Sequence, residues 1–386
     1  MVSPLKNSPA ILSPTNRSRY RLRARFGDRQ AALLAVLIAF VGLPTATALA
    51  DGHRVPMREP AWSGWTLFLD NDRLSLAERD EGYTAGLTLT RSGRLARSAP
   101  LSLHGPLDRL NRWLGWEDQP DRDTHRYHSI SYGFAAFTPS DIEATDPITD
   151  DRPYACLLFT SSTQQRVRPV KRIADLSTLS LGLLGHDLCE ELQNAIHEAT
   201  GGPVARGWGH QISDGGEPTA LWRFGQQGLL TASGAENRHE VSWSWDAQLG
   251  WVTDAGAGLS WRWGRIRSPW WSFAPHHYEY APLGTPIFRY RPRGRDESVS
   301  EAYLWAGAMV RYRFYNTLLQ GQFRSSDVEL GSGQIRRPLL ETWIGFTQCL
   351  NNGTEISLSI RARSPEFKGP NKSDLLWGGL WIRKYF

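Results

Sequence analysis

Apolar and polar residues alternate with a period of two along much of the chain, a pattern that predicts β-strands. In one segment the apolar face would carry Val241, Trp243, Trp245, Ala247, Leu249 and Trp251, and the other face Ser242, Ser244, Asp246, Gln248 and Gly250. In a second segment Ile356, Leu358, Ile360 and Ala362 alternate with Ser357, Ser359, Arg361 and Arg363. Arginines on one face of a strand suit a polar lumen better than a soluble core. The pattern therefore favours a transmembrane barrel, whose strands alternate lipid-facing and lumen-facing residues.

Extended along the chain, the same pattern predicts about twelve strands, and single-chain outer-membrane barrels have an even number. We expect an all-β fold, a 12-stranded antiparallel transmembrane β-barrel with a short helix in an outer loop. The predicted strands are 62–70, 83–94, 127–137, 152–165, 175–185, 218–228, 239–252, 256–265, 300–314, 338–350, 354–363 and 376–386.

With both termini in the periplasm, alternate connections face outward. These outward connections are 71–83, 138–151, 186–217, 253–255, 315–337 and 364–375. The inward connections 95–126 and 266–299 are longer than periplasmic turns usually are. The first of them has the pattern of a short helix around Leu107–Leu114.

Both ends of the chain carry signals for export. A basic stretch precedes the apolar segment Ala31–Leu43 and the small-residue site Ala48-Leu49-Ala50, which is the order of a secretory signal peptide. We expect residues 1–50 to be this signal and 51–386 to be the barrel domain. The last predicted strand ends at Phe386, as is typical of strands presented to the outer-membrane assembly machinery. Together the two ends predict a multi-pass barrel in the outer membrane of a Gram-negative bacterium.

Composition agrees with this picture. The chain has 17 tryptophans among 386 residues, and its mean hydropathy is −0.42. Aromatic girdles on a polar chain are typical of outer-membrane barrels, although soluble all-β proteins are the commoner class. No Lys/Arg block in the mature chain suggests binding to nucleic acid. The net charge of +5 would suit an anionic, phosphate-bearing lipid.

One helix is predicted in the third outward connection. Asp187 is the expected N-cap, Glu190 completes a capping-box pattern, and Gly201-Gly202-Pro203 would end the helix. On its surface Glu190, Gln193, Asn194 and His197 fall at i, i+3, i+4 and i+7, which is one face. This face is poor core material, because burial would leave several polar groups needing partners. It either faces water, as charged helix faces usually do, or contributes to a site.

Other polar clusters lie where predicted strands meet the same outer rim. These clusters are Asn71-Asp72, Tyr83-Thr84, Thr138-Pro139 and Asp151-Arg152-Pro153-Tyr154. Strand parity brings them, from widely separated parts of the sequence, to the end of the barrel that holds His197. The convergence predicts a site at this rim. The alternative is that rim residues are polar because they touch headgroups and water.

Three cysteines, Cys156, Cys189 and Cys349, are too few for a disulfide scaffold. Cys156 and Cys189 could pair in an oxidising compartment. Cys189 lies on the predicted helix but off the His197 face, so packing or a disulfide is favoured over a nucleophilic role.

The spaced motifs between Trp62 and Gln211 resemble those of the lipid A 3'-O-deacylase family of outer-membrane barrels, and the C-terminal half resembles it mainly in strand pattern. The motifs are Asn71-Asp72, Tyr83-Thr84-Ala85-Gly86, Thr138-Pro139-Ser140-Asp141, Asp151-Arg152-Pro153-Tyr154-Ala155, Gln193-Asn194-x-x-His197 and Gly207-Trp208-x-x-Gln211.

The resemblance implies an active site between the barrel wall and an outer-loop helix, dependence on Ca²⁺, and lipid A or lipopolysaccharide of the outer leaflet as substrate. It implies that His197 is the general base and Gln193 a supporting contact. Asn71, Asp72 and Thr84 would organise the metal or the substrate, with Asp72 and Asn71 as metal ligands. Tyr83, Arg152 and Arg206 are the expected substrate-binding residues. We expect a monomer.

One departure from the family concerns phosphate recognition. The characterised deacylases have adjacent basic residues in the loop after the Thr-Pro or Ser-Pro pair, whereas Asp141–Asp151 contains no Lys or Arg here. Arg152 or Arg206 would have to substitute, or the preferred lipid differs.

The hypothesis that follows is hydrolysis of the 3'-linked acyloxyacyl ester. A neutral imidazole can take a proton from water near pH 7, and Ca²⁺ bound by carboxylate and amide oxygens can polarise the carbonyl.

Three alternatives remain open. An outer-membrane phospholipase-like hydrolase would use a serine beside a histidine, but no His-x-Ser-Asn-Gly-like run occurs. A non-enzymatic pore or structural barrel fits the polar lumen. A metal or ligand receptor built on His276-His277 is the least favoured, because strand parity places that segment on the periplasmic side.

Overall fold

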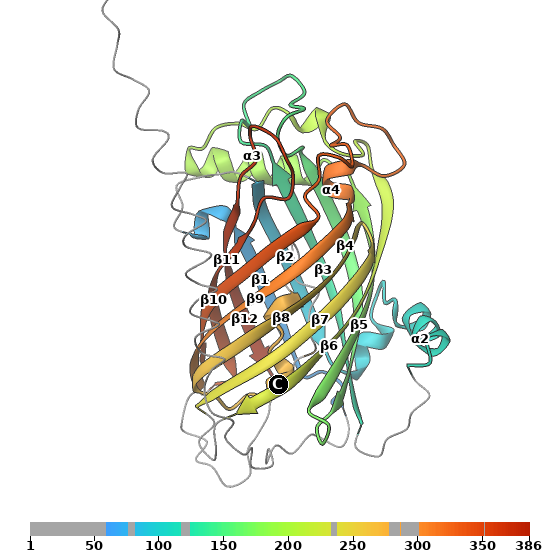
Figure 1. Cartoon of the computed structure of the whole chain (residues 1–386), viewed down its shortest axis with the longest axis vertical. Coiled ribbons are helices and arrows are strands. Elements are labelled where there is room, and N and C mark those ends of the chain that lie inside the picture. Colours follow the sequence, from blue (N-terminus) through green and yellow to red (C-terminus); the bar gives the residue numbers. More distant parts are fainter. Residues whose placement is uncertain are drawn as a thin grey trace, which may run out of the picture. The chain divides into compact units, whose positions relative to one another are not determined.

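A computed structural model describes residues 59–75, 82–116, 124–232, 238–277, 286, 301–350 and 352–386. The predicted signal peptide lies outside these residues. Twelve strands form one closed antiparallel barrel in which sequence neighbours pair and β1 closes on β12 (Figure 1). The strands are β1 Gly64–Asn71, β2 Gly82–Ser92, β3 His125–Thr138, β4 Ala155–Arg168, β5 Ile173–Leu184, β6 Glu217–Ala232, β7 His239–Gly250, β8 Val252–Arg265, β9 Glu301–Asn316, β10 Pro338–Cys349, β11 Thr354–Arg363 and β12 Leu375–Tyr385.

All twelve predicted strands are confirmed, and so is the all-β barrel class. The predicted turn at 253–255 is wrong, because β7 ends at Gly250 and β8 begins at Val252. Trp251 between them is buried against Phe159 inside the barrel rather than facing lipid as predicted. The chain reverses at Gly250, where φ is 142°, and this reversal ends the alternation one residue before the tryptophan.

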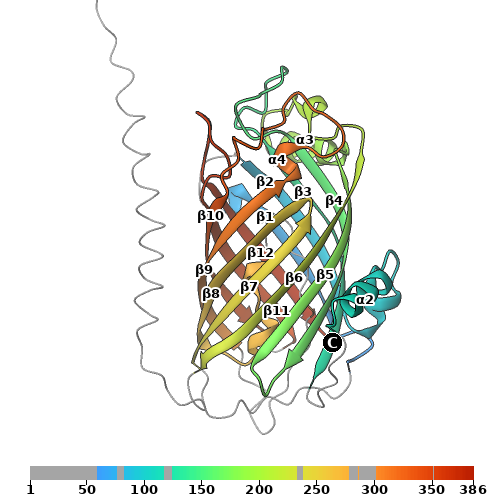
Figure 2. The same ribbon diagram turned by 45° about the vertical axis from the view of Figure 1, so that its right-hand side comes forward.

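The helical segments described lie in the connections between strands. They are η1 Asp72–Ser75, η2 Arg94–Ser98, α2 His104–Trp113, α3 Leu188–Thr200, η3 Trp208–His210, η4 Trp270–Ser272, η5 Pro275–His277 and α4 Thr317–Gln320. The short helix predicted around Leu107–Leu114 is thus confirmed as α2. Figure 2 shows α2 and α3 at opposite ends of the barrel. No helix in the described ranges is long and apolar enough to cross a membrane.

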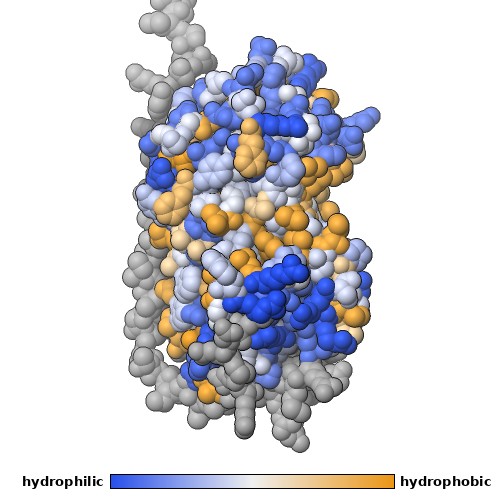
Figure 3. Space-filling view, turned by 90° about the vertical axis from the view of Figure 1, so that its right-hand side faces the viewer, coloured by the Kyte–Doolittle hydropathy of each residue, from blue (hydrophilic) through white to orange (hydrophobic). Residues whose placement is uncertain are grey.

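The two faces of the wall follow the predicted alternation. Trp245, Leu249 and Leu358 are exposed on the outer surface, whereas Asp246 and Ser357 are buried inside. On the side that carries α2, Figure 3 shows apolar residues gathered across the middle of the surface and hydrophilic residues toward both ends. Such a band is what a lipid bilayer requires of a barrel.

The connection after β8 enters the lumen instead of remaining outside the barrel. Arg223 and Arg311 donate hydrogen bonds to the carbonyl of His276, and Arg361 donates to that of Pro275. Trp270 and Trp271 are almost fully buried, and Gln165 of β4 donates to the carbonyl of Trp271. In Figure 1 this segment is visible as short gold turns within the barrel.

Buried ion pairs stabilise the position of this segment, residues 269–277, which we call the plug. Asp246 lies 2.8 Å from Arg223 and 2.6 Å from Arg311, so the guanidinium groups that bind the plug are themselves neutralised by the wall. Because these side chains fill the lumen, the structure argues against an open pore. The burial of both His276 and His277 likewise argues against a receptor site exposed to the periplasm.

Candidate active site

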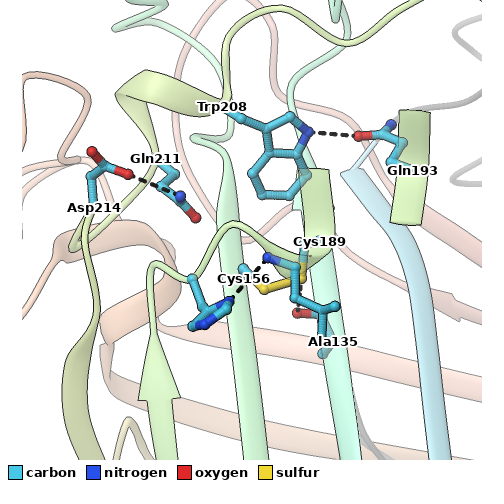
Figure 4. Close-up of a disulfide and its surroundings, with 9 residues drawn as sticks. Ala135, Cys156, Cys189, Gln193, Trp208, Gln211 and Asp214 are labelled. Atoms are coloured by element: carbon cyan, nitrogen blue, oxygen red, sulfur yellow. Dashed lines mark hydrogen bonds between the residues drawn. A yellow bond between two sulfur atoms is a disulfide. The ribbon is translucent and has the colours of Figure 1, made fainter. Parts of the chain in front are cut away.

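Helix α3 lies across the end of the barrel opposite the C-terminus. It ends at Gly201, whose φ of 73° is left-handed, as the predicted stop requires. Asp187 is the N-cap, but its side chain makes no capping hydrogen bond, so the predicted capping box is wrong. Helix position is set instead by a disulfide between Cys189 and Cys156 of β4 (Figure 4). The pairing considered from the sequence is therefore confirmed, and Cys189 is not a nucleophile.

A groove of about 470 Å³, including its part open to solvent, separates α3 from the outer surface of β2 and β3. It lies on the lipid-facing side of the wall and not in the lumen, because Phe134 and Ala136 are outward residues of β3 that pack with α3 and its disulfide. The lining residues are Asn71, Arg73, Thr84, Ala85, Phe134, Ala136, Cys189, Leu192, Gln193, Ile196 and His197.

A β-bulge in β2 turns Thr84 toward the groove. The register with β3 shifts between Tyr83 and Ala85, so one extra residue is inserted and two consecutive side chains, Thr84 and Ala85, line the groove. The hydroxyl of Thr84 shares a hydrogen bond of 2.7 Å with that of Thr138. Thr84 is thereby held at the rim with its hydroxyl oriented.

The end of β1 supplies Asn71 and Arg73. The Asn71 amide donates to the carbonyl of Thr84 at 2.6 Å, while its oxygen accepts from the backbone N–H of Arg73. The following turn, η1, packs closely on β12 at Gly378, where a Cβ would lie 2.3 Å from the carbonyl oxygen of Leu74. Glycine at this position lets the turn approach the wall and so fixes Arg73 beside the groove.

His197 is held in one orientation by the chain that follows α3. Its Nδ1 lies within hydrogen-bond distance of the carbonyl oxygen of Pro203. A carbonyl can only accept, so Nδ1 carries a proton, and in the neutral imidazole Nε2 then carries the lone pair. Asn194 braces the same return loop through both backbone groups of Ala205. The imidazole, 4% exposed, is thus fixed in the tautomer that a general base needs.

Gln193 is oriented by a tryptophan. The indole Nε1 of Trp208 donates to Oε1 of Gln193 at 2.9 Å (Figure 4). The opposite amide group, Nε2, is buried without a hydrogen-bond partner among the described residues. An amide held by its oxygen directs its N–H groups the other way, and Gln193 lines the groove. The residue can therefore donate to a bound carbonyl or oxyanion.

The structure brings together four of the predicted site residues, Asn71, Thr84, Gln193 and His197. Asp72, 2% exposed, lies beneath the rim between two lining residues and accepts from the backbone of Arg73. The fourth polar residue of the predicted helix face, Glu190, does not line the groove. Partial burial and the neighbouring Asp187 raise the pKa of Glu190.

Three predicted substrate-binding residues lie elsewhere. Tyr83 points into the barrel, where it packs on Phe137 and Trp377, because the bulge places it on the opposite face from Thr84. Arg152 is buried and ion-paired with Glu366. Arg206 is exposed on the loop after α3 but does not line the groove. Tyr83 and Arg152 therefore do not line this groove, and substrate binding by them stays a prediction.

Two residues that sequence reasoning missed complete the site. Arg73 is the one cation among the described lining residues, and its position next to Asn71-Asp72 is the signal that could have revealed it. Trp208 belongs to a motif noted in the sequence, but its hydrogen bond to Gln193 depends on how two loops fold together.

The donor chemistry of the rim fits a hard cation in type. Asn71, Asp72 and Thr84 offer amide, carboxylate and hydroxyl oxygens, which Ca²⁺ prefers. In the described part of the chain no group of three or more His, Cys, Asp or Glu could hold a metal ion. Because Ca²⁺ takes about six to eight oxygens, these residues could hold it only together with water and substrate oxygens.

Comparison with protein families identifies the chain at this point. The family model described as "Outer membrane protein LpxR" matches residues 33–386. The chain belongs to the LpxR outer membrane protein family. This membership, together with the closed barrel, places the protein in the outer membrane of a Gram-negative bacterium.

The solved structure of LpxR supports the fold. LpxR from Salmonella typhimurium is similar with a TM-score of 0.63 and 17% identity, over 84% of this chain and 100% of that one. The β domain of the Bordetella autotransporter BrkA has a TM-score of 0.41 and 12% identity, over 84% of this chain and 100% of that one. No curated protein matches the chain in sequence. The family model spans all twelve strands of the barrel.

Proposed function

We propose that the chain hydrolyses the 3'-linked acyloxyacyl ester of lipid A in the outer leaflet. The observation that carries the proposal is the groove outside the wall, which sets a buried imidazole and an amide donor where a membrane lipid can reach them. Membership of the LpxR family supports lipid A as the substrate. A lipid would enter the groove from the side, without passing through the filled lumen.

His197 would act as the general base. With its Nδ1 proton bound to Pro203, Nε2 can accept a proton from a water molecule, which then attacks the ester carbonyl. When the bond between the carbonyl carbon and the sugar oxygen breaks, the imidazolium returns this proton to the leaving sugar oxygen. The developing negative charge on the carbonyl oxygen would be met by the amide of Gln193, since pre-oriented donors stabilise an oxyanion without reorganisation. If bound at Asn71, Asp72 and Thr84, Ca²⁺ would supply further polarisation of the carbonyl.

The remaining lining residues suit the rest of a phosphorylated lipid. Leu192, Ile196 and Phe134 form an apolar side for acyl chains. Arg73 is placed to bind a phosphate, for which the guanidinium geometry is well matched. It would serve in place of the basic residues missing from Asp141–Asp151.

The geometry gives less support to a serine phospholipase. None of the described lining residues is a serine, and the one thiol, Cys189, is oxidised in the disulfide. The hydroxyl of Thr84, the one hydroxyl among the described lining residues, shares its hydrogen bond with Thr138 and not with His197. An activated water is therefore the attacking group that we propose.

Mass spectrometry of lipid A from Gram-negative cells with and without the protein tests the proposal. We expect lipid A to lose one acyloxyacyl group, whereas a phospholipase would leave its mass unchanged and release lysophospholipid. His197→Ala should lower the rate by about 10²–10⁴-fold, the usual contribution of a general base. Glu198→Gln, at an exposed neighbour on the same helix, should retain activity.

The metal is tested in the same assay with purified protein. EGTA should stop hydrolysis and added Ca²⁺ should restore it, because the three rim residues alone do not polarise the ester. Unchanged lipid A in cells that contain the folded barrel would contradict the proposed function. Activity that persists in EGTA would contradict only the role of Ca²⁺ and not the proposed hydrolysis.

A further inference from the structure

The outer surface of β3 to β6 changes from apolar to polar at one level, toward the end that carries α2. On β5 the outward residues are apolar at Leu179, Leu181 and Leu183. Toward the N-terminal end of the strand, the outward residues are the polar Ser177 and Asp175. The outward polar residues on the neighbouring strands are His128 of β3, Ser162, Gln164 and Arg166 of β4, and Gln226 of β6. This level is the lower edge of the apolar band, where the membrane interface begins.

Helix α2 and its flanks lie on this polar part of the wall. The backbone N–H of Leu103 donates to Ser162 at 2.8 Å. The amide of Asn111 donates to Gln164 at 2.9 Å and accepts from Ser177 at 2.8 Å. The helix is thus attached to the outside of the barrel directly below the apolar band, at the depth of lipid headgroups.

The two faces of α2 differ sharply. His104, Leu107 and Asn111 are buried against the wall. Arg109, Arg112 and Trp113, at i, i+3 and i+4, share the opposite face, and Trp113 is 81% exposed. Exposed tryptophan beside arginine is typical of elements that lie in a membrane interface.

The basic charge belongs to the outward face of the helix and not to the whole connection. From 94 to 116 the charged side chains are four arginines and one carboxylate, Asp108, which is ion-paired with Arg97 at 2.7 Å, whereas Glu117, Asp118, Asp121 and Asp123 follow in the sequence. We propose that the Arg109–Arg112–Trp113 face of α2 lies in the headgroup layer of the periplasmic leaflet and binds the phosphates of anionic glycerophospholipids. Arginine suits this role because it binds phosphate through two parallel hydrogen bonds.

Site-specific quenching in vesicles tests the proposal. Full-length protein with Cys349→Ser and Trp113→Cys, labelled with a fluorophore at position 113, is reconstituted with phosphatidylcholine plus brominated phosphatidylglycerol or, separately, brominated phosphatidylcholine. We expect quenching by the anionic lipid to exceed that by the neutral lipid by about twofold or more at equal mole fraction. A label at Leu181→Cys, in the apolar band of β5, should be quenched equally by both.

Charge variants complete the test. Arg109→Gln with Arg112→Gln should abolish the preference for the anionic lipid, while Arg109→Lys with Arg112→Lys should keep most of it. If the double variant does not insert into vesicles, Arg109→Gln alone, at an exposed side chain, should weaken the preference for the anionic lipid. No quenching at position 113, or equal quenching by the two lipids, would overturn the proposal. The outcome is independent of lipid A hydrolysis.

Discussion

The amide of Gln193 and the indole of Trp208 form a pair in which one side chain sets the direction of the other. The hydrogen bond to Oε1 of Gln193 leaves Nε2 directed away from the indole. Nothing in the spacing of these residues specifies the contact, because they lie on different sides of the loop that follows α3.

Gln193→Ala should lower kcat by about 10²–10³-fold, the usual loss for one oxyanion donor. Trp208→Phe keeps the aromatic ring but removes the hydrogen bond. It should lower kcat by about three- to tenfold, in line with about 0.5–1.5 kcal/mol for a neutral hydrogen bond. Initial rates on lipid A in mixed micelles check both. Gln211→Ala is the control, since Gln211 binds Asp214 and not the groove. An effect confined to KM would contradict the role in catalysis.

Thr84 and Tyr83 show where prediction at the residue scale fails. The sequence indicates that both lie at the rim, but not which one faces the groove. A bulge inverts the alternation at this point, and its position depends on pairing with β3. His197 and Gln193 were predictable because a helix places residues four apart on one face whatever its surroundings.

At the scale of elements, α3 is joined to the wall by the disulfide of Cys156 and Cys189, which closes a loop with a sequence separation of 33. In the chain-entropy model, a disulfide that closes a loop of this length raises the free energy of unfolding by about 3–4 kcal/mol.

Cys156→Ala with Cys189→Ala should loosen α3 without opening the barrel, because the strand ladder does not depend on the bond. Limited proteolysis should cleave near α3 faster in this variant, and heat-modifiable migration of the barrel on gels should be unchanged. Cys349→Ser should behave as wild type, since Cys349 forms no disulfide. Equal protease resistance of all three proteins would show that α3 is held by packing alone.

Helix α2 should dock less stably in acid. Burial, with a contribution from nearby His128, lowers the pKa of His104 to about 3. The neutral imidazole is the form that the docked helix accepts, with Nε2 bound to the carbonyl of Ser129. Glu59, bonded to His128, and Arg97 are the other charged groups nearby. The docking is therefore fully stable above the unfolded pKa of about 6.5.

That stability should fall as the pH drops from 6.5 toward 3, by about 2 kcal/mol at pH 5. Hydrogen exchange of residues 104–113, corrected for the intrinsic effect of pH, measures the change. His104→Gln should remove most of the dependence. Protection that is constant from pH 7 to pH 4 would contradict the expectation.

Elements were the most predictable level of the structure. Every strand follows from the alternation that a two-sided wall imposes, and α2 and α3 follow from helical periodicity. The position of the segment after β8 could not be predicted in this way, because its aromatic residues and histidines have no regular period. They are held in the lumen by arginines that come from three other strands.

For the whole molecule, the filled lumen distinguishes this barrel from a channel. Purified protein in planar bilayers should give no steady ion conductance, because the segment with Trp270 and Trp271 is held inside by buried guanidinium groups. A porin reconstituted in the same way is the positive control. Stable conductance steps would show that the plug leaves the lumen in a membrane.

The groove lies on the lipid-facing side of the wall. This orientation determines whether the rate depends on the concentration of substrate in the membrane or in the bulk solution. A substrate that never leaves its leaflet meets the protein by diffusing in two dimensions. Turnover should then follow the mole fraction of lipid A among its neighbours rather than its amount per volume. Diluting the sample with buffer should leave the initial rate per protein unchanged, while diluting the membrane with inert lipid should lower it.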